Sequence, residues 1–177
     1  VFSIKKLMKS KGNIVFLGMM ASGKTSVGKL ISKKLKKEFF DTDQYIENSL
    51  GMNISKIFET KGEDYFRKFE QKISLEILKK KNIVISLGGG SFLNKKIRNE
   101  ILDNHLSFWL NWNNQILIKR IRNSTKRPLA INTSDKELMN LIKIRSNIYS
   151  KALYKIDCNE LSKLEVVDKI INIYETN

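Results

Sequence analysis

The chain has 177 residues, of which 41% are hydrophobic and 29% charged, and its formal net charge is +15. This length and balance are ordinary for a globular domain with a full core, and no apolar run approaches the roughly 18 residues of a membrane span. A single cysteine excludes a disulfide framework and a cysteine-rich zinc cluster, so we expect a cytoplasmic protein with no membrane partner.

The predicted elements alternate between strands and helices along the chain. Short apolar runs predict strands, and apolar residues spaced three and four apart predict helices. The expected strands cover 13–17, 38–43, 82–90, 106–112 and 153–158. The expected helices cover 24–37, 43–50, 54–59, 62–81, 94–104, 114–123, 134 to about 150 and 162 to about 175. Capping boxes of Ser134 with Glu137 and of Ser162 with Glu165 begin the last two.

Successive β–α units with apolar strands indicate an α/β fold of three layers, in which helices cover both faces of a five-stranded parallel sheet. We expect one domain over residues 13–177 and a flexible N-terminal extension over 1–12. Ligands of such sheets bind beyond the carboxyl ends of the strands. The candidate functional residues are therefore those that follow the strands.

The stretch FLGMMASGKTSVG (16–28) follows the first predicted strand and opens the first helix. It fits the pattern Gly-x-x-x-x-Gly-Lys-Ser/Thr through Gly18, Gly23, Lys24 and Thr25. Such a loop surrounds a phosphate with backbone N–H groups at a helix N-terminus. The lysine reaches the terminal phosphates and the hydroxyl ligates Mg²⁺, so the pattern predicts nucleotide binding.

Two aspartates and three glycines follow the next two strands. One of the two carboxylates, Asp41 or Asp43, suits a role in holding a metal ion through water. The other suits a role in binding an acceptor hydroxyl and taking its proton. The alternative is a turn in which Asp43 caps the following helix. Gly88, Gly89 and Gly90 either let a ligand approach the backbone closely or form a tight turn.

Few of the 33 basic residues are arginines. Because lysine is the usual basic residue of this chain, each arginine is a candidate for a specific contact with a carboxylate or phosphate. Glu63, Arg67 and Glu70 share one helix face, which indicates either an exposed ion-pair ladder or an arginine that binds an anionic substrate and is steadied by Glu70. Residues 123–134 form the one long loop, which is typical of a mobile lid. Its Arg127 is a candidate for contact with the transferring phosphoryl group.

The motifs GMMASGKT, DTD, GEDYFRKFE, SLGGG, KRPLA and RSNIY occur in an order and spacing that resembles the shikimate kinase family, over about residues 13–175. The resemblance implies a P-loop kinase fold, like that of nucleoside monophosphate kinases, with an acceptor-binding region over about 42–70 and a lid over about 123–134. It also implies transfer of the γ-phosphoryl group of ATP, with Mg²⁺, to the 3-hydroxyl of shikimate in the chorismate route to aromatic amino acids.

The resemblance further implies a role for individual residues of this chain. The implied nucleotide-binding residues are Ala21, Ser22, Gly23, Lys24, Thr25, Ser26, Arg120 and Arg127. The implied acceptor-binding residues are Asp43, Phe58, Phe66, Arg67, Glu70, Gly88, Gly89, Gly90 and Arg145. Lys24, Asp43 and Arg127 are implied as catalytic residues, and Thr25 and Asp41 as ligands of Mg²⁺, Asp41 through water.

Some features depart from the family pattern. Ala21 stands where the family usually has glycine, and Ala130 stands where the lid commonly has leucine. The segment 158–163, on the adenine side, matches only loosely. Outside the motifs, His105 is expected at a strand edge and Arg98 on plain surface.

Two alternative functions stay open at this point. One is another small-molecule kinase, for gluconate or a nucleoside monophosphate, against which the Asp-x-Asp and triple-glycine motifs speak. The other is a nucleotide-binding or nucleic-acid-binding module, which the +15 charge favours. Because lysine runs lie at predicted helix C-termini, where cations suit the helix dipole, we favour a solvated surface and expect a monomer with no nucleic-acid partner.

Overall fold

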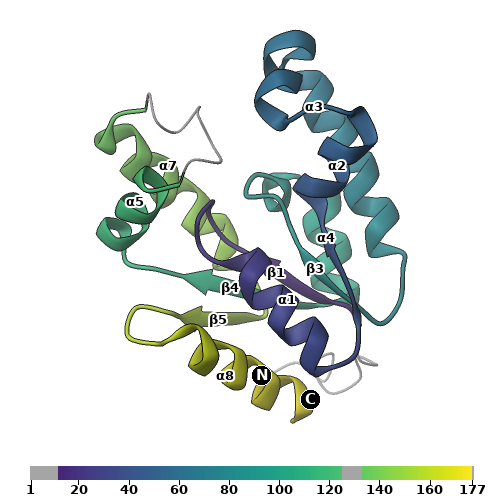
Figure 1. Ribbon diagram of the computed structural model, residues 1–177, viewed down its shortest axis with the longest axis vertical. Helices are drawn as coiled ribbons and strands as arrows, with labels where there is room; N and C mark the ends of the chain where they lie inside the picture. The colour runs from purple at the N-terminus through teal and green to yellow at the C-terminus, as the bar shows by residue number, and fades with distance from the viewer. Residues whose placement is uncertain (1–11, 125–132, 177) are drawn as a thin grey trace.

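The computed structural model describes residues 12–124 and 133–176. Five parallel strands form one sheet in the order β2-β3-β1-β4-β5 (Figure 1). The strands are β1 (Ile14–Leu17), β2 (Glu38–Asp41), β3 (Ile83–Ser86), β4 (Leu106–Asn111) and β5 (Tyr154–Asp157). The strand order reverses on either side of β1, so the phosphate loop after β1 lies at the switch point, where α/β sheets bind ligands.

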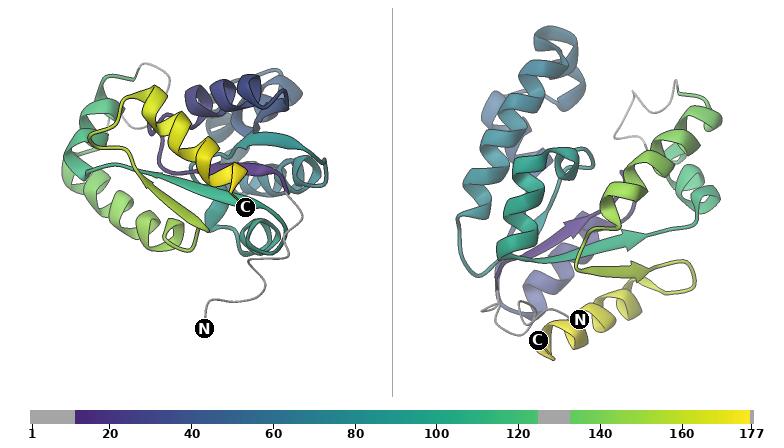
Figure 2. Two further views of the ribbon diagram at one scale, coloured as in Figure 1. Left: turned by 90° about the horizontal axis from the view of Figure 1, so that it is seen from below. Right: turned by 180° about the vertical axis from the view of Figure 1, so that it is seen from behind.

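Helices cover both faces of this sheet, which confirms the predicted three-layer α/β architecture (Figures 1 and 2). The helices are α1 (Lys24–Lys34), α2 (Thr42–Leu50), α3 (Ile54–Leu78), the short 3₁₀ helix η2 (Ser91–Leu93), α4 (Lys95–Asn104), α5 (Asn114–Arg122), α7 (Asp135–Tyr149) and α8 (Lys163–Glu175). Among the described residues, no helix is both long enough and apolar enough to cross a membrane.

Alternating side chains of each strand enter two separate cores. Ile14 and Phe16 of β1 pack with α1 and α8, whereas Val15 and Leu17 pack with the helices of the opposite face. Both sets are apolar because both faces of a parallel sheet are covered. The α1 layer lies very close to β2: a Cβ on Gly28 would come within 2.6 Å of the Phe39 ring. Close packing of α1 fixes the direction in which its N-terminus points.

Local signals set the ends of several helices as predicted. Both capping boxes, Ser134 with Glu137 and Ser162 with Glu165, are present. Hydrogen bonds from these serines lower the pKa of the two exposed glutamates. The expected break between helices 54–59 and 62–81 lies at Gly62, whose φ of 80° interrupts α3.

The alternative in which Asp43 caps the helix after β2 is wrong. Asp41 is the N-cap of α2, and its carboxylate accepts from the backbone N–H groups of Asp43 and Gln44. The Asp43 side chain is therefore not used as the helix cap. Of the expected N-terminal extension over 1–12 only Gly12 is described, and residues 125–132 of the expected lid also lie outside the described part of the chain.

Candidate active site

The phosphate loop between β1 and α1 has the backbone that its glycines predict. Gly18 has φ 140° and Gly23, the residue before α1, has φ 96°, values that L side chains rarely adopt. The Lys24 ammonium donates to the carbonyls of Gly18 (2.9 Å) and Met19 (2.8 Å), so it lies across the loop. The loop therefore brings together backbone N–H groups, a helix N-terminus and a lysine, which is the chemistry of a phosphate site.

Ala21 occupies a left-handed backbone conformation within this loop, with φ 60°. A residue with a Cβ is disfavoured there by about 1–2 kcal/mol. The departure from glycine noted in the sequence thus falls at a position where glycine has a physical advantage.

Three oxygen groups from different elements meet beside the start of α1. The Thr25 hydroxyl donates to the Asp41 carboxylate (2.6 Å) and lies 3.4 Å from the Ser86 hydroxyl at the end of β3. Oxygen donors of this kind suit Mg²⁺. No group of three or more His, Cys, Asp or Glu side chains that could hold a metal exists among the described residues. The set therefore fits a magnesium ion held largely by water and phosphate oxygens, and Ser86 had no signal in the sequence.

The three glycines after β3 lie among the charged side chains that the resemblance implies for acceptor binding. A Cβ on Gly88 would come within 2.6 Å of Asp43 Oδ1, and one on Gly90 within 2.5 Å of Arg67 Nη1. Thr42, between the two aspartates, accepts from the Gly88 N–H at 2.8 Å and so ties α2 to this turn. Any side chain at these glycines would displace the charged groups around them.

Arg67 is held by two carboxylates, as the functional reading of its helix face expected. Its guanidinium donates to Glu70 (2.8 Å) and to Glu63 (3.2 Å). Burial lowers the pKa of Arg67, but Glu70 and Glu63 outweigh this and the pKa is raised overall. Glu70 is 3% exposed, and its second oxygen accepts from Ser91 at 2.6 Å. The pair of Arg67 with Glu70 is therefore not an exposed ion pair, whereas the Glu63 side chain, which is 63% exposed, forms an exposed one with Arg67.

Aromatic rings lie beneath the same guanidinium. The Cζ of Arg67 is 5.8 Å from the centre of the Phe58 ring and 5.2 Å from that of Phe66, and the two rings are 4.7 Å apart. Cations are attracted to aromatic faces at such distances. Phe58 and Phe66 thus form an apolar wall next to the charged groups.

Arg145 reaches the glycine turn from α7, which packs on the same face of the sheet as α3. Its Nη1 is 3.6 Å from where a Cβ on Gly89 would lie and 3.8 Å from Met19 Sδ. Its Nε is buried and has no hydrogen-bond partner among the described residues. One turn along α7, Tyr149 donates to the Gly89 carbonyl. Arg67 and Arg145 therefore approach one turn from two elements, an arrangement that suits a carboxylate ligand.

The nucleotide side is bordered by α5. Arg120 donates from Nε to the Ala21 carbonyl (2.9 Å), and its Cζ lies 4.3 Å from the centre of the Trp112 ring. Cys158, at the end of β5, is buried, and burial raises its pKa to about 11. The thiol is therefore neutral near pH 7 and is no candidate nucleophile.

Arg127, expected on the lid, lies outside the described residues. Arg122 forms an ion pair with Asp135 (2.7 Å) and donates to the Thr133 carbonyl, so it joins the two described sides of the expected lid. The expectation of plain surface for Arg98 is wrong, because its guanidinium donates to the carbonyls of Phe92 (3.0 Å) and Leu93 (2.8 Å). Arg98 thus provides hydrogen bonds to two carbonyls of the 3₁₀ helix η2, which follows the glycines.

His105 is structural, as expected. It lies directly before β4, where its Nδ1 accepts from the Asn13 N–H at 3.3 Å. This contact is at the amino ends of the strands, opposite the phosphate loop.

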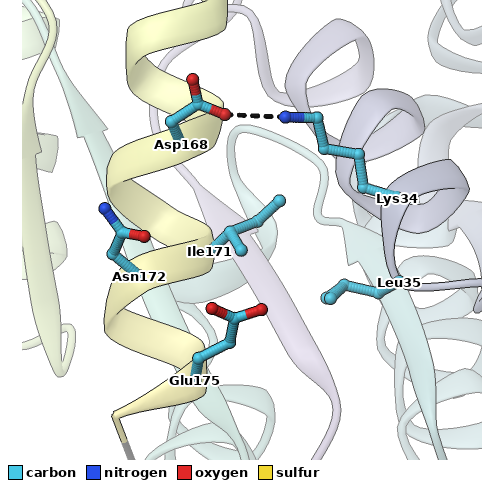
Figure 3. Close-up of a pocket in the computed structure, with 6 residues that line it drawn as sticks. All are labelled: Lys34, Leu35, Asp168, Ile171, Asn172 and Glu175. Atoms are coloured by element: carbon cyan, nitrogen blue, oxygen red, sulfur yellow. Dashed lines mark hydrogen bonds and ion pairs between the residues drawn. The ribbon is translucent and has the colours of Figure 1, made fainter.

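A separate hollow of about 350 Å³ lies between α1 and α8 (Figure 3). It contains the ion pair of Lys34 with Asp168 (2.7 Å). Lys34 ends α1, which runs back from the phosphate loop, so the hollow is at the other end of the sheet from the residues described above. None of the predicted site residues lines it.

Comparison with known proteins agrees with this geometry. The shikimate kinase family model matches residues 20–175. The shikimate kinase of Bacillus subtilis is 42% identical over 167 residues, which cover 90% of this chain and 87% of the relative. The solved structure of Acinetobacter baumannii shikimate kinase in complex with shikimate covers 98% of both chains at 30% identity, with a TM-score of 0.87.

A gluconokinase structure from Sinorhizobium meliloti also matches, with a TM-score of 0.59 and 18% identity, and this likeness shows the fold alone. The family model covers most of the chain, and the relatives with 30% identity or more cover nearly all of it. The chain belongs to the shikimate kinase family.

Proposed function

We propose that the protein is an ATP-dependent kinase that transfers the γ-phosphoryl group of ATP to the 3-hydroxyl of shikimate, giving shikimate 3-phosphate and ADP. The observation that carries this proposal is the pair of arginines, Arg67 and Arg145, that converge on the three-glycine turn next to the phosphate loop. They suit the carboxylate of an acidic acceptor. Family membership supports shikimate as that acceptor.

In this proposal, Arg67 and Arg145 bind the acceptor carboxylate. Glu70 and Ser91 hold Arg67 in place before the acceptor arrives, so little orientation entropy is lost on binding. Phe58 and Phe66 contact the apolar face of the ring. The backbone of Gly88, Gly89 and Gly90 touches the acceptor closely because no Cβ intervenes.

Asp43 orients the attacking hydroxyl and takes its proton. Its carboxylate lies within the same group as Gly88, Ser91 and Glu70, on the side of the turn that faces α2. The loop amides, Lys24 and Arg127 stabilise the negative charge of the transferring phosphoryl group. Ser22 and Gly23 of the loop and Ser26 of the first turn of α1 bind the nucleotide.

Mg²⁺ would be held by Thr25 directly and by Asp41 through water. When bound, the ion neutralises charge on the phosphate oxygens of ATP. Ser86 lies close enough to Thr25 to orient the same water shell. The 2.6 Å contact between Thr25 and Asp41 supports the assignment, because both groups already face one point.

We also propose the remaining features of the enzyme. Residues 13–177 form one kinase domain with an acceptor-binding region at about 42–70, and residues 123–134 act as a lid that excludes water from the reaction. Arg120 lies against the adenine. The protein acts as a cytoplasmic monomer in the chorismate route to aromatic amino acids, without a nucleic-acid partner.

The test is ADP release by the purified protein with Mg²⁺ and ATP, with and without shikimate. Gluconate and CMP serve as control acceptors. We expect release that depends on shikimate alone and is abolished in Lys24→Ala, whereas Lys29→Ala, an exposed lysine of the same helix, retains it. Release that depends on gluconate or CMP, or no stimulation by any acceptor while ATP still binds, would overturn the proposal.

A further inference from the structure

Two side chains from outside the phosphate loop bind consecutive carbonyls within it. The indole Nε1 of Trp112, directly after β4, donates to the Ser22 carbonyl at 2.9 Å. Arg120 of α5 donates to the Ala21 carbonyl, also at 2.9 Å. The two side chains stack on each other, with the guanidinium carbon 4.3 Å from the ring centre. The loop is thus held from one side by a stacked pair.

These contacts fix the direction of two backbone N–H groups of the phosphate loop, one of which closes the loop and one of which lies at the start of α1. In a trans peptide the carbonyl and the next residue's N–H point in opposite directions. The Arg120 contact therefore orients the N–H of Ser22, which donates to the Met19 carbonyl at 3.2 Å. The Trp112 contact orients the N–H of Gly23, the residue before α1, which points away from the indole.

Ala21 makes this restraint necessary. Its φ of 60° is a conformation that alanine disfavours, so the loop tends to leave it. A loop with glycine at this position adopts the same conformation without that tendency. Of the two carbonyls that the pair binds, one is that of Ala21 itself and the other is that of the next residue, Ser22.

We infer that Trp112 is a positioning residue for ATP: with Arg120, it holds the phosphate loop in the binding conformation that Ala21 disfavours. The inference rests on the proposed ATP-dependent activity. Trp112 does not touch the reacting atoms, so it acts on nucleotide affinity rather than on the chemical step. Its ring is half-buried between the two cores, so loss of the ring itself would also affect folding.

The test separates the hydrogen bond from the ring. Trp112→Phe keeps an aromatic ring for Arg120 but removes the N–H, and Trp109→Phe removes the other tryptophan, which is buried in β4. We expect Trp112→Phe to raise the KM for ATP, and the Kd for ADP measured by calorimetry, about three- to tenfold, as for loss of one hydrogen bond. The KM for shikimate and kcat should change less than twofold, and Trp109→Phe should leave ADP affinity within twofold of the wild type.

The same substitution in an Ala21→Gly background tests the cause. We expect the effect of Trp112→Phe on ADP affinity to fall below twofold there, because the glycine loop needs no restraint. In the Trp109→Phe variant Trp112 is the remaining tryptophan of the two in the chain, so its fluorescence should change on ADP binding.

Four outcomes would overturn one claim or another. Unchanged ADP affinity in Trp112→Phe overturns the inference, and so does an equal loss in affinity for both substrates, which would indicate general damage. An undiminished effect in the Ala21→Gly background overturns the role of Ala21. Absence of shikimate-dependent ADP release in the wild type overturns the proposed function alone, since ADP affinity is measured without turnover.

Discussion

The two halves of the candidate site are built in different ways. On the acceptor side, charged side chains pair with other side chains: Arg67 with Glu70, and Glu70 with Ser91, both partners being buried. On the nucleotide side, Trp112 and Arg120 bind backbone carbonyls. In the proposed function, acceptor recognition therefore depends on which side chains are present, whereas phosphate recognition depends on the shape of the backbone.

This division has an electrostatic reason. A phosphate can be met by N–H groups of any residue, so the loop needs only the right conformation and neighbours that maintain it. A small carboxylate acceptor must be distinguished from other anions, and that requires charges held at fixed points. Substitutions on the acceptor side should therefore change one substrate, and those on the nucleotide side the other.

The largest effect is expected for Asp43→Asn, which tests whether the acceptor side carries the proton transfer. We expect kcat to fall by about 10²–10⁴-fold, the usual contribution of a general base, with ADP affinity unchanged. Steady-state rates and calorimetry measure the two quantities. Asp64→Asn, at an exposed position of α3, is the matched control and should keep full activity. A kcat loss below about tenfold would mean that Asp43 only orients the hydroxyl.

A large effect on one substrate is expected for Arg67→Lys. Lysine keeps the charge but loses the planar fork that contacts Glu63 and Glu70 as well as a carboxylate. We expect the KM for shikimate to rise about 10- to 100-fold and the KM for ATP to stay within about twofold. Lys68→Arg, the reverse change at the next, exposed residue, should alter neither. If both KM values rise together, the separation of the two halves is wrong.

A moderate effect is expected for Ser91→Ala, which tests whether the hydrogen bond from Ser91 to Glu70 helps to hold Arg67 in place. The substitution leaves Glu70 buried without one of its hydrogen bonds. We expect the free energy of unfolding to fall by about 1–3 kcal/mol, together with a rise in the KM for shikimate. Chemical denaturation gives the first quantity. Ser49→Ala, at an exposed position of α2, is the control, and an equal loss there would contradict the argument.

The smallest effect is expected for Ala21→Gly on the nucleotide side. Relief of the left-handed alanine should stabilise the loop by up to about 1 kcal/mol, seen as tighter ADP binding or a higher free energy of unfolding. Ala152→Gly is the control because Ala152 is not among the positive-φ residues, and there glycine should destabilise instead. Weaker ADP binding in Ala21→Gly would show that the loop gains from the alanine.

Much of the fold was predictable because its signals are local. The two serine capping boxes and the break at Gly62 depend on residues within one helical turn of each other. The phosphate loop is equally local, since its glycines and Lys24 lie within seven residues. The alternative in which Asp43 caps the helix is wrong because Asp41, two residues earlier, has the same chemistry and is the residue that precedes the helix.

The site was predictable where a motif carries it and unpredictable where partners are distant. Arg98 was misjudged because the carbonyls that it binds belong to a 3₁₀ turn with no periodic signal. Ser86 lies within an apolar strand, Ser91 directly follows the three glycines, and Tyr149 ends the RSNIY motif, but none of the three has a neighbour in sequence that indicates the partner it binds.

Sequence alone was enough to predict the alternation of strands and helices, the phosphate loop and the identity of the charged groups that follow the strands. Periodicity, capping and glycine spacing act over a few residues, so they can be read without a structure. Which of those groups come into contact depends on tertiary packing. Trp112 binds a carbonyl 90 positions away and Tyr149 one 60 positions away, because β1 lies between β3 and β4 in the sheet and α7 packs against η2, which brings these distant segments together.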